Sequence, residues 1–416
     1  MRTQHRGEGR TRAGAPDSPP RTTERFPCLD GYRALAALAV VLFHVLSYAR
    51  LRGSTALDDV WLRLGNYGVT IFFLLSGFLL WRPYVVAHFD GRPSRPTGAY
   101  LRARVLRIAP AYWVALAALI LGFRFVEAGS IGDTAAYVGL VQIYRADTVL
   151  GGLGVAWTLC IEISFYLMIP GLARAVKRYD RSRAPTLGAR MRAQLGVVAS
   201  LYLIAVIWRL VMVLGSPDLG PTLHWLPAYL DWFALGMLAA VTHSWVARGG
   251  GLPRWANDLV DAPWLCWALA AGVYGVCTQL GLPPGFAAAT GAQTMGRFLL
   301  NGTSALLLLL PGVLGDPNKG GIRKTLRSRG LTWLGSISFG IYLWHTIWLR
   351  QVERWVAAGQ YPDGAVAMLA AVMALTVGTA MISFETIEKP AMRLRRWPRG
   401  RAPHPVPGDA DLAAAP

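Results

Sequence analysis

The chain has 416 residues, of which 54% are hydrophobic and 16% are charged, and its mean hydropathy is +0.36. These values exclude an ordinary soluble globular protein and indicate a helical protein that crosses a membrane several times. The formal net charge of +19 does not indicate nucleic-acid binding, because the basic residues lie between apolar runs and in two tails, as the positive-inside rule expects.

Residues 1–26 form a basic segment rich in Arg, Gly, Pro, Ser and Thr. They contain almost no apolar clusters, so we expect a disordered cytoplasmic tail. No small-residue cleavage site follows the first apolar run, which is therefore expected to be a retained anchor. Residues 27–397 are expected to form one transmembrane domain, and the Pro- and Ala-rich residues 398–416 a second disordered tail.

Ten stretches of this domain have the length and hydrophobicity of a transmembrane helix. They cover approximately residues 31–50, 66–86, 109–127, 154–176, 195–214, 225–245, 263–281, 296–314, 332–351 and 365–387. The short amphipathic stretch 130–145 is expected at the membrane interface instead. Connections rich in Lys and Arg alternate with sparse ones, so the sequence predicts an all-α bundle of about ten spans in the plasma membrane, with both termini cytoplasmic.

The four cysteines are Cys28, Cys160, Cys266 and Cys277, and they show no Cys-x-x-Cys spacing. Three of them lie in apolar segments. We therefore expect small buried side chains that form neither a disulfide framework nor a metal site.

The first span carries two polar side chains, Arg33 and His44, that an apolar helix usually avoids. They are eleven positions apart, so they share one face of the helix and are separated by about 16 Å along its axis. On a straight helix they cannot touch. Such groups usually face a bundle interior or a wet cavity. For His44, an interhelical hydrogen bond and a role as general base are both open.

Arg104 and Arg107 are three positions apart at the cytoplasmic end of the third span. On a helix they point the same way. Plain anchoring under the positive-inside rule explains either one alone. A pair at the mouth of a bundle is also suited to bidentate contacts with phosphate groups.

Glu162 lies within the fourth span, where a carboxylate is costly and needs a partner. The candidate partners are Arg33, Arg107 and His44. An ion pair that holds helices together and a direct chemical role are equally open.

Two further polar residues lie near the end of the chain. His345 follows the segment Gly335–Gly340, whose small residues favour close helix approach, and we expect a packing or interfacial role for it. Glu388 precedes Pro390, which cannot continue the last helix, and its role is expected to be structural.

Six motifs occur in a fixed order along the chain. They are Arg33-x10-His44, Gly68–Phe78, the Arg104-x-x-Arg107-Ile-x-Pro-x-Tyr112 run, Trp157-x-Leu-x-x-Glu162-x-x-Phe-Tyr166, the Gly335 to His345 segment, and Glu388-x-Pro390. Each motif is weak alone, but together they resemble the acyltransferase type 3 family over about residues 28–395. The departures are Thr158, where Ser is common, and Ile163, where a second Glu is frequent.

That family consists of integral membrane O-acyltransferases that modify sugars, surface polysaccharides, peptidoglycan and macrolides. The resemblance implies a cytoplasmic acyl-CoA donor, acetyl-CoA in the first instance, and a sugar-containing acceptor. It implies His44 as the catalytic residue and Arg33 as its partner, with Arg104 and Arg107 as contacts for the CoA phosphates. Our own prediction is that His44 acts as the general base, and that Glu162 is the candidate for a third catalytic residue that couples Arg33 to His44. No permanently bound cofactor and no metal is expected.

A transporter or flippase is the alternative from another class. It would use Arg33, His44 and Glu162 as an intramembrane polar pathway. Transporters often contain paired repeats and broken helices around a site at the membrane midplane. No repeat is visible in this sequence, so the sequence favours the acyltransferase.

Overall fold

The computed structural model describes residues 26–50, 67–125, 129–181, 186–215, 220–279, 281 and 289–394. Within these ranges every regular element is a helix. The two expected tails lie outside the described residues, with the exception of Phe26. Its ring packs against those of Phe78 and His243, at centroid distances of 5.0 Å in both cases, so the packed chain begins within the segment that was assigned to the tail.

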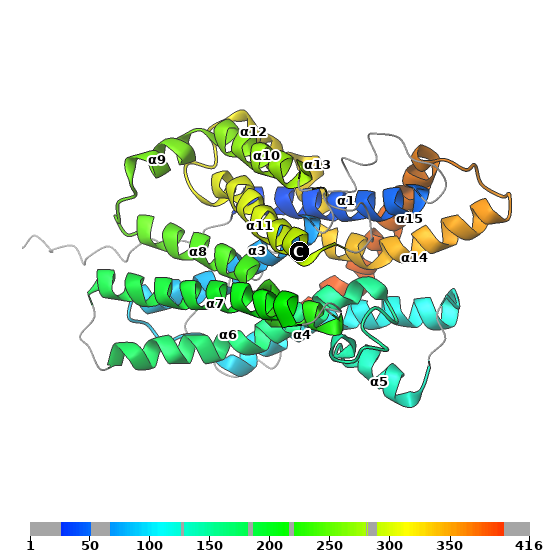
Figure 1. Cartoon of the computed structure of the whole chain (residues 1–416), viewed down its shortest axis with the longest axis horizontal. Coiled ribbons are helices and arrows are strands. Elements are labelled where there is room, and N and C mark those ends of the chain that lie inside the picture. The colour runs from blue at the N-terminus through cyan, green and yellow to red at the C-terminus, as the bar shows by residue number, and fades with distance from the viewer. Residues whose placement is uncertain are drawn as a thin grey trace, which may run out of the picture.

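The helices differ widely in length, and Figure 1 shows the long ones packed as one bundle. They are α1 (Pro27–Arg50), α3 (Tyr67–Phe89), α4 (Thr97–Ala117), α5 (Ile131–Val138), α6 (Trp157–Arg181), α7 (Leu187–Gly215), α8 (Leu230–Val246), α9 (Arg254–Asp261), α10 (Pro263–Gln279), α11 (Gly291–Val313), α12 (Gly321–Leu326), α13 (Arg329–Ser336), α14 (Ser338–Ala357), α15 (Ala365–Ser383) and α16 (Lys389–Arg393). Short 3-10 turns are η2 (Gln142–Tyr144), η3 (Gly154–Ala156), η4 (Gly220–His224) and η5 (Leu226–Tyr229). Two π-helical turns, η1 (Ala118–Gly122) and η6 (Phe384–Glu388), extend α4 and α15.

Seven helical segments of the described chain are long and apolar enough to cross a membrane. They are Pro27–Tyr48, Tyr67–Phe89, Thr97–Gly122, Gly154–Tyr179, Leu187–Gly215, Gly291–Val313 and Ala365–Arg393. The pair α9 and α10, bent by 98°, is an eighth if it counts as one broken span. A multi-pass helical membrane protein is therefore confirmed, whereas the count of ten is not. The helices α8 and α10 have only 17 residues each, and the span expected at 332–351 is divided between α13 and α14.

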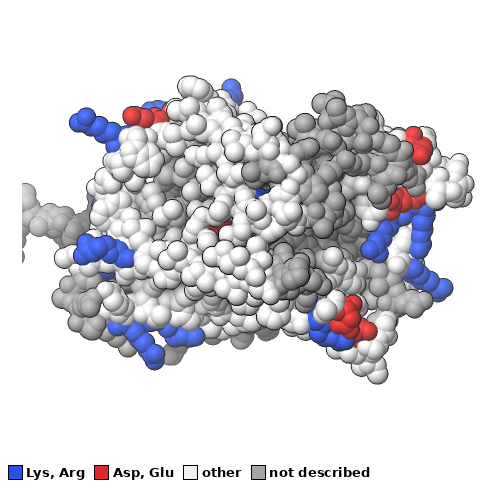
Figure 2. All heavy atoms as spheres, viewed as in Figure 1, with Lys and Arg blue, Asp and Glu red and all other residues white. Residues whose placement is uncertain are grey.

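The charged side chains match such a placement. Figure 2 shows Lys and Arg at the two ends of the molecule and a largely uncharged band between them. The end near α6 to α9 is mainly basic in this view, whereas acidic and basic side chains mix at the end near α5 and α14. Arg145, for example, pairs there with Asp133 and Asp147. The hydrocarbon region of a bilayer requires an uncharged band of this kind.

The first span, α1 (blue in Figure 1), contacts six other helices: α3, α11, α12, α13, α14 and α15. Its small residues Ala34, Ala36 and Ala37 are fully buried. Small side chains let neighbouring helices approach closely, which is how helices associate in a membrane without a hydrophobic driving force. The polar residues of α1 are therefore held in a well-packed position.

The helices α3 and α8 cross closely at two glycines. A methyl group at Gly77 would collide with the carbonyl oxygen of Phe233, and one at Gly236 with that of Leu74. Only glycine leaves enough room for the two backbones at this crossing. The crossing fixes α3, which carries part of the site described below.

The expected span 332–351 is broken into α13 and α14, which meet at Ile337 with φ −101° and ψ 9°. Close packing accompanies the break, because a methyl group at Gly335 would collide with the backbone carbonyl of Asp30 on α1. Helix α14 then starts at Ser338. Breaks of this kind are tolerated at membrane depth where neighbouring helices or a cavity satisfy the backbone.

Two smaller predictions can be compared with the structure. The stretch 130–145 forms only the short helix α5 and the turn η2, and Ser130 caps α5 by accepting a hydrogen bond from the Asp133 amide at 3.1 Å. Cys28, Cys160 and Cys266 are buried free thiols, as expected. The side chain of Cys277 lies outside the described residues.

Candidate active site

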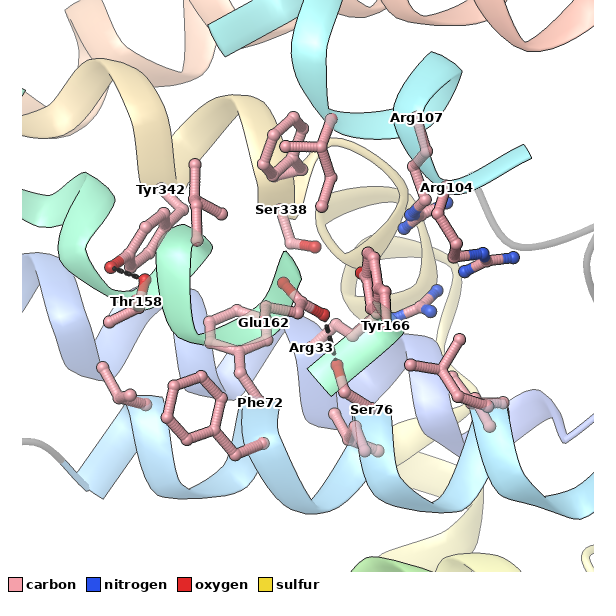
Figure 3. A pocket seen from close by; sticks show the side chains of 18 residues that line it. Arg33, Phe72, Ser76, Arg104, Arg107, Thr158, Glu162, Tyr166, Ser338 and Tyr342 are labelled. Carbon is pink, nitrogen blue, oxygen red and sulfur yellow. Dashed lines mark hydrogen bonds between the residues drawn. The ribbon is translucent and has the colours of Figure 1, made fainter. Parts of the chain in front are cut away.

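A pocket lined by three arginines lies between α1, α3, α4, α6 and α14, and we call it the arginine pocket (Figure 3). Its walls are Arg33, Val69, Phe72, Phe73, Leu75, Ser76, Leu79, Leu80, Arg104, Arg107, Ile108, Thr158, Leu159, Glu162, Tyr166, Ser338, Phe339 and Tyr342. Four of the five residues that the sequence analysis selected are therefore in one place. The fifth, His44, is not among them.

The charges of the arginine pocket are unevenly distributed. Figure 3 shows Arg33, Arg104 and Arg107 gathered at one end and Thr158 with Tyr342 at the other. Arg104 and Arg107 come from α4 and share the pocket, as their spacing of three positions predicts. The guanidinium of Arg33 donates a hydrogen bond to Asp30 at 3.2 Å. Three guanidinium groups at one end form a binding place for an anion with several oxygens.

Glu162 lies between the two ends of the pocket (Figure 3). It accepts a hydrogen bond from the Ser76 hydroxyl, with 2.5 Å between the oxygens. The sequence suggests Arg33, Arg107 or His44 as its partner and does not indicate Ser76. The neighbouring Tyr166 ring lies under the Arg104 guanidinium, at 5.9 Å from its centroid. The carboxylate thus lies where it can offset part of the positive charge of the arginines.

His44 lines a second pocket, which we call the histidine pocket. Its walls are His44, Tyr48, Leu119, Leu150, Gly152, Leu153, Gly154, Val155, Trp157, Thr346, Leu349 and Arg350. Arg33 is not one of them, in agreement with the axial separation of about 16 Å expected for a straight helix. The two polar residues of α1 therefore serve different cavities, and no direct coupling between them is available.

A hydrogen-bonded group stands between the two pockets. The hydroxyl oxygens of Thr158 and Tyr342 lie 2.7 Å apart. Both approach the carbonyl oxygen of Val155, at 3.1 Å from Thr158 and 2.8 Å from Tyr342. Thr158 and Tyr342 line the arginine pocket, and Val155 lines the histidine pocket. These three residues form part of the wall that a reactant must cross to pass between the cavities.

His345 has a neighbour that the sequence does not indicate. A packing or interfacial role is expected from the sequence, and the side chain is fully buried, beside His44. The two ring centroids are 4.9 Å apart, and Nε2 of His345 lies 3.4 Å from Nδ1 of His44. The Tyr-Leu-x-His motif marks His345 in the sequence but does not reveal this neighbour. Glu388 is buried in η6 and does not line either pocket.

Comparisons with known proteins identify the family. A family model described as an acyltransferase domain matches residues 26–384. The chain belongs to the acyltransferase type 3 family.

Three relatives illustrate the range. The chain is 29% identical to the acyltransferase MdmB of Streptomyces mycarofaciens, over 94% of this chain and 98% of that protein. It is 28% identical to the exopolysaccharide production protein ExoZ of Rhizobium meliloti, over 84% and 95%. It is 23% identical to the peptidoglycan O-acetyltransferase OatA of Listeria monocytogenes, over 77% of this chain and 48% of that protein. No solved structure matches the chain.

The family and the apolar helices together make this chain a multi-pass membrane O-acyltransferase. The resemblance stated from the six motifs is therefore confirmed. A transporter is disfavoured, because the family match covers nearly all of the transmembrane helices.

Proposed function

We propose that this acyltransferase moves an acyl group from acyl-CoA to a hydroxyl of a sugar-containing acceptor, with His44 as general base. The observation that carries the proposal is the pair of adjacent pockets. One has three guanidinium groups at one end, and the other contains an imidazole within the membrane domain. An anionic donor and a neutral hydroxyl acceptor need these two different surroundings.

The donor binds in the arginine pocket. Arg33, Arg104 and Arg107 hold the phosphates of CoA, because guanidinium groups make paired, charge-assisted hydrogen bonds to phosphate oxygens. The acyl thioester then points past Glu162 toward the Thr158–Tyr342 end of the pocket. Acetyl-CoA is the donor that we expect, and it acts as a co-substrate and not as a resident cofactor.

The acceptor hydroxyl approaches His44 in the histidine pocket. His44 takes the hydroxyl proton while the oxygen attacks the thioester carbonyl carbon. The new carbon–oxygen bond forms, the carbon–sulfur bond breaks, and the CoA thiolate leaves with the proton that His44 held. Glu162 acts as a positioning group that balances the arginines before the donor binds. The Thr158–Tyr342 wall has to open for the thioester to meet the acceptor.

We further propose ten spans in the plasma membrane, with both termini in the cytoplasm. The alternation of basic and sparse connections supports this orientation, and so does the mainly basic end near α6 to α9 (Figure 2). In this orientation Arg33 lies near the cytoplasm, where CoA is available. His44 lies deeper, toward the opposite face.

The sugar-containing acceptor is supported by the relatives. One is named a peptidoglycan O-acetyltransferase and another an exopolysaccharide production protein. Tyr48 and Trp157 line the histidine pocket, and aromatic rings combine an apolar face with a polar edge, as sugar binding requires. Arg350 adds a donor of hydrogen bonds at the same pocket.

The test uses the full chain, purified into lipid nanodiscs, with radiolabelled acetyl-CoA and a panel of oligosaccharides and one glycosylated macrolide. Ester formation is measured for wild type, His44→Ala and the control His243→Ala, a histidine that lines neither pocket. Loss of a general base lowers the rate by about 10²-fold or more, so His44→Ala should be nearly inactive while the control keeps its activity. Full activity of His44→Ala would exclude this residue as the base.

A further inference from the structure

His345 and His44 form a pair of imidazole rings in an edge-to-face contact, with an interplanar angle of 61°, next to an apolar cluster. His345 lies on α14 and is fully buried. The residues one turn away on its helix, Ile341 and Leu349, and the neighbours of His44 on α1, Val41 and Val45, belong to one apolar cluster. A leucine would fill such a position with no polar atom to satisfy. The presence of an imidazole here therefore needs a reason beyond packing.

The backbone contacts assign the proton on each ring. A carbonyl oxygen only accepts hydrogen bonds, so the ring nitrogen that touches it must carry the hydrogen. Nδ1 of His345 lies 2.8 Å from the carbonyl oxygen of Tyr342 and 3.2 Å from that of Ile341. Nδ1 of His44 lies 2.8 Å from the carbonyl oxygen of Val40. Both neutral rings therefore carry hydrogen on Nδ1 and a lone pair on Nε2.

This assignment makes the contact between the rings directional. Nε2 of His345 can only accept, and Nδ1–H of His44, at 3.4 Å, donates to it as well as to Val40. The order of donors runs from His44 to His345 and from His345 to the Tyr342 carbonyl. The lone pair of His44 is left on Nε2, which is the atom that a general base uses.

We propose that His345 is a positioning residue for the transfer reaction, which holds His44 in the Nδ1–H tautomer and stabilises its protonated form. The inference rests on the proposed function, because it assumes that His44 is the base. When the acceptor proton moves to Nε2 of His44, the ring becomes a cation and its Nδ1–H becomes a stronger donor. The bond to Nε2 of His345 then becomes charge-assisted and strengthens. No proton passes to His345.

Two substitutions at this position separate the proposed role from packing. In His345→Asn the short amide can still donate to the Tyr342 carbonyl, but it provides no acceptor near His44. In His345→Gln the longer amide places an oxygen acceptor close to the former Nε2. Both variants keep a polar side chain of similar size. Thr379→Val is the structural control, because it removes the acceptor of the Trp348 hydrogen bond between α14 and α15 without touching either pocket.

The experiment measures kcat, KM for acetyl-CoA and the melting temperature in nanodiscs. The proteins are the wild type, His345→Asn, His345→Gln and Thr379→Val, with His44→Ala measured beside them. Loss of a hydrogen bond to a group that is charged in the transition state lowers the rate by about tenfold to a hundredfold. We therefore expect kcat of His345→Asn to fall by that factor with an unchanged KM, because the arginine pocket is intact. His345→Gln should recover to within about threefold of wild type. Thr379→Val should lose melting temperature but not kcat.

Either of two results overturns the inference while His44→Ala remains inactive. One is a kcat of His345→Asn close to that of wild type. The other is an equal loss of kcat in His345→Asn and His345→Gln, in proportion to the fall in their melting temperatures. If His44→Ala itself keeps full activity, the base assignment fails and the positioning role fails with it.

Discussion

Removing the guanidinium groups of Arg104 and Arg107 should weaken donor binding only when the donor carries phosphates. Each arginine in a charge-assisted hydrogen bond contributes about 1.5–3 kcal/mol, which corresponds to about tenfold to a hundredfold in affinity. The two side chains share one pocket, so their effects are not independent. We expect the apparent KM for acetyl-CoA in Arg104→Ala/Arg107→Ala to rise by at least about tenfold and by less than the product of the single effects.

The assay compares acetyl-CoA with acetyl-pantetheine, which has the same thioester arm and no phosphate. With acetyl-pantetheine the wild type and the double variant should have similar KM values. Arg102→Ala is the matched control, because Arg102 lies on the same helix but is exposed and donates to the carbonyl oxygen of Leu394. The single variant Arg107→Ala is measured as well, because it removes one guanidinium group and keeps the contact between Arg104 and the Tyr166 ring.

Two results would contradict the reasoning. The first is a KM increase of equal size for acetyl-CoA and acetyl-pantetheine, which would mean that the arginines shape the pocket and do not bind phosphate. The second is an equal increase in Arg102→Ala, which would mean that the overall positive charge of the region attracts the donor and that this pocket has no special part in it.

Two further predictions concern the bundle. Asp231→Asn leaves the Arg209 guanidinium buried without its counter-charge, since the two side chains are 1% and 0% exposed. The free energy of unfolding should fall by about 3–5 kcal/mol, whereas replacement of both residues by Leu should lower it less. Thermal unfolding in detergent measures the order, and a single variant more stable than the double Leu variant would contradict this reasoning. Gly236→Ala should lower the melting temperature sharply because its methyl group meets the Leu74 carbonyl oxygen, whereas Gly272→Ala, which faces open space, should not. Equal shifts in the two glycine variants would show that the crossing tolerates the methyl group.

The sequence predicted the apolar parts of the long helices well and their charged ends poorly. The third span is expected from residue 109, but α4 begins at Thr97, so the helix extends well beyond its apolar part and carries Arg104 and Arg107 on this extension. Hydropathy detects the segment inside the bilayer, and a helix continues beyond it as long as its hydrogen bonds are satisfied. Hydropathy also gives no sign of the break at Ile337. The small polar residues there predict a close helix contact and not an interruption of the helix.

The site could be predicted only as far as one helix at a time. The spacing of Arg33 and His44 on α1, and of Arg104 and Arg107 on α4, follows from helical geometry. The contact between His44 and His345 joins positions 301 residues apart, and no periodicity encodes it. Ser76 was quoted within a motif, yet its hydrogen bond to Glu162 depends on how α3 and α6 cross. Partners that lie on different helices require the packed structure.

The rigid first helix supports a CoA thioester over a shorter acyl donor. Arg33 and His44 are held about 16 Å apart by α1, and their pockets are separated by the Thr158–Tyr342 pair. A donor whose anionic end binds at Arg33 must therefore place its reactive carbon far from its charge. In an acyl phosphate the reactive carbon and the anionic charge are only a few bonds apart, so such a donor cannot span the distance between Arg33 and His44. The long pantetheine arm of CoA separates them, so the distance along α1 is itself an argument for the donor proposed above.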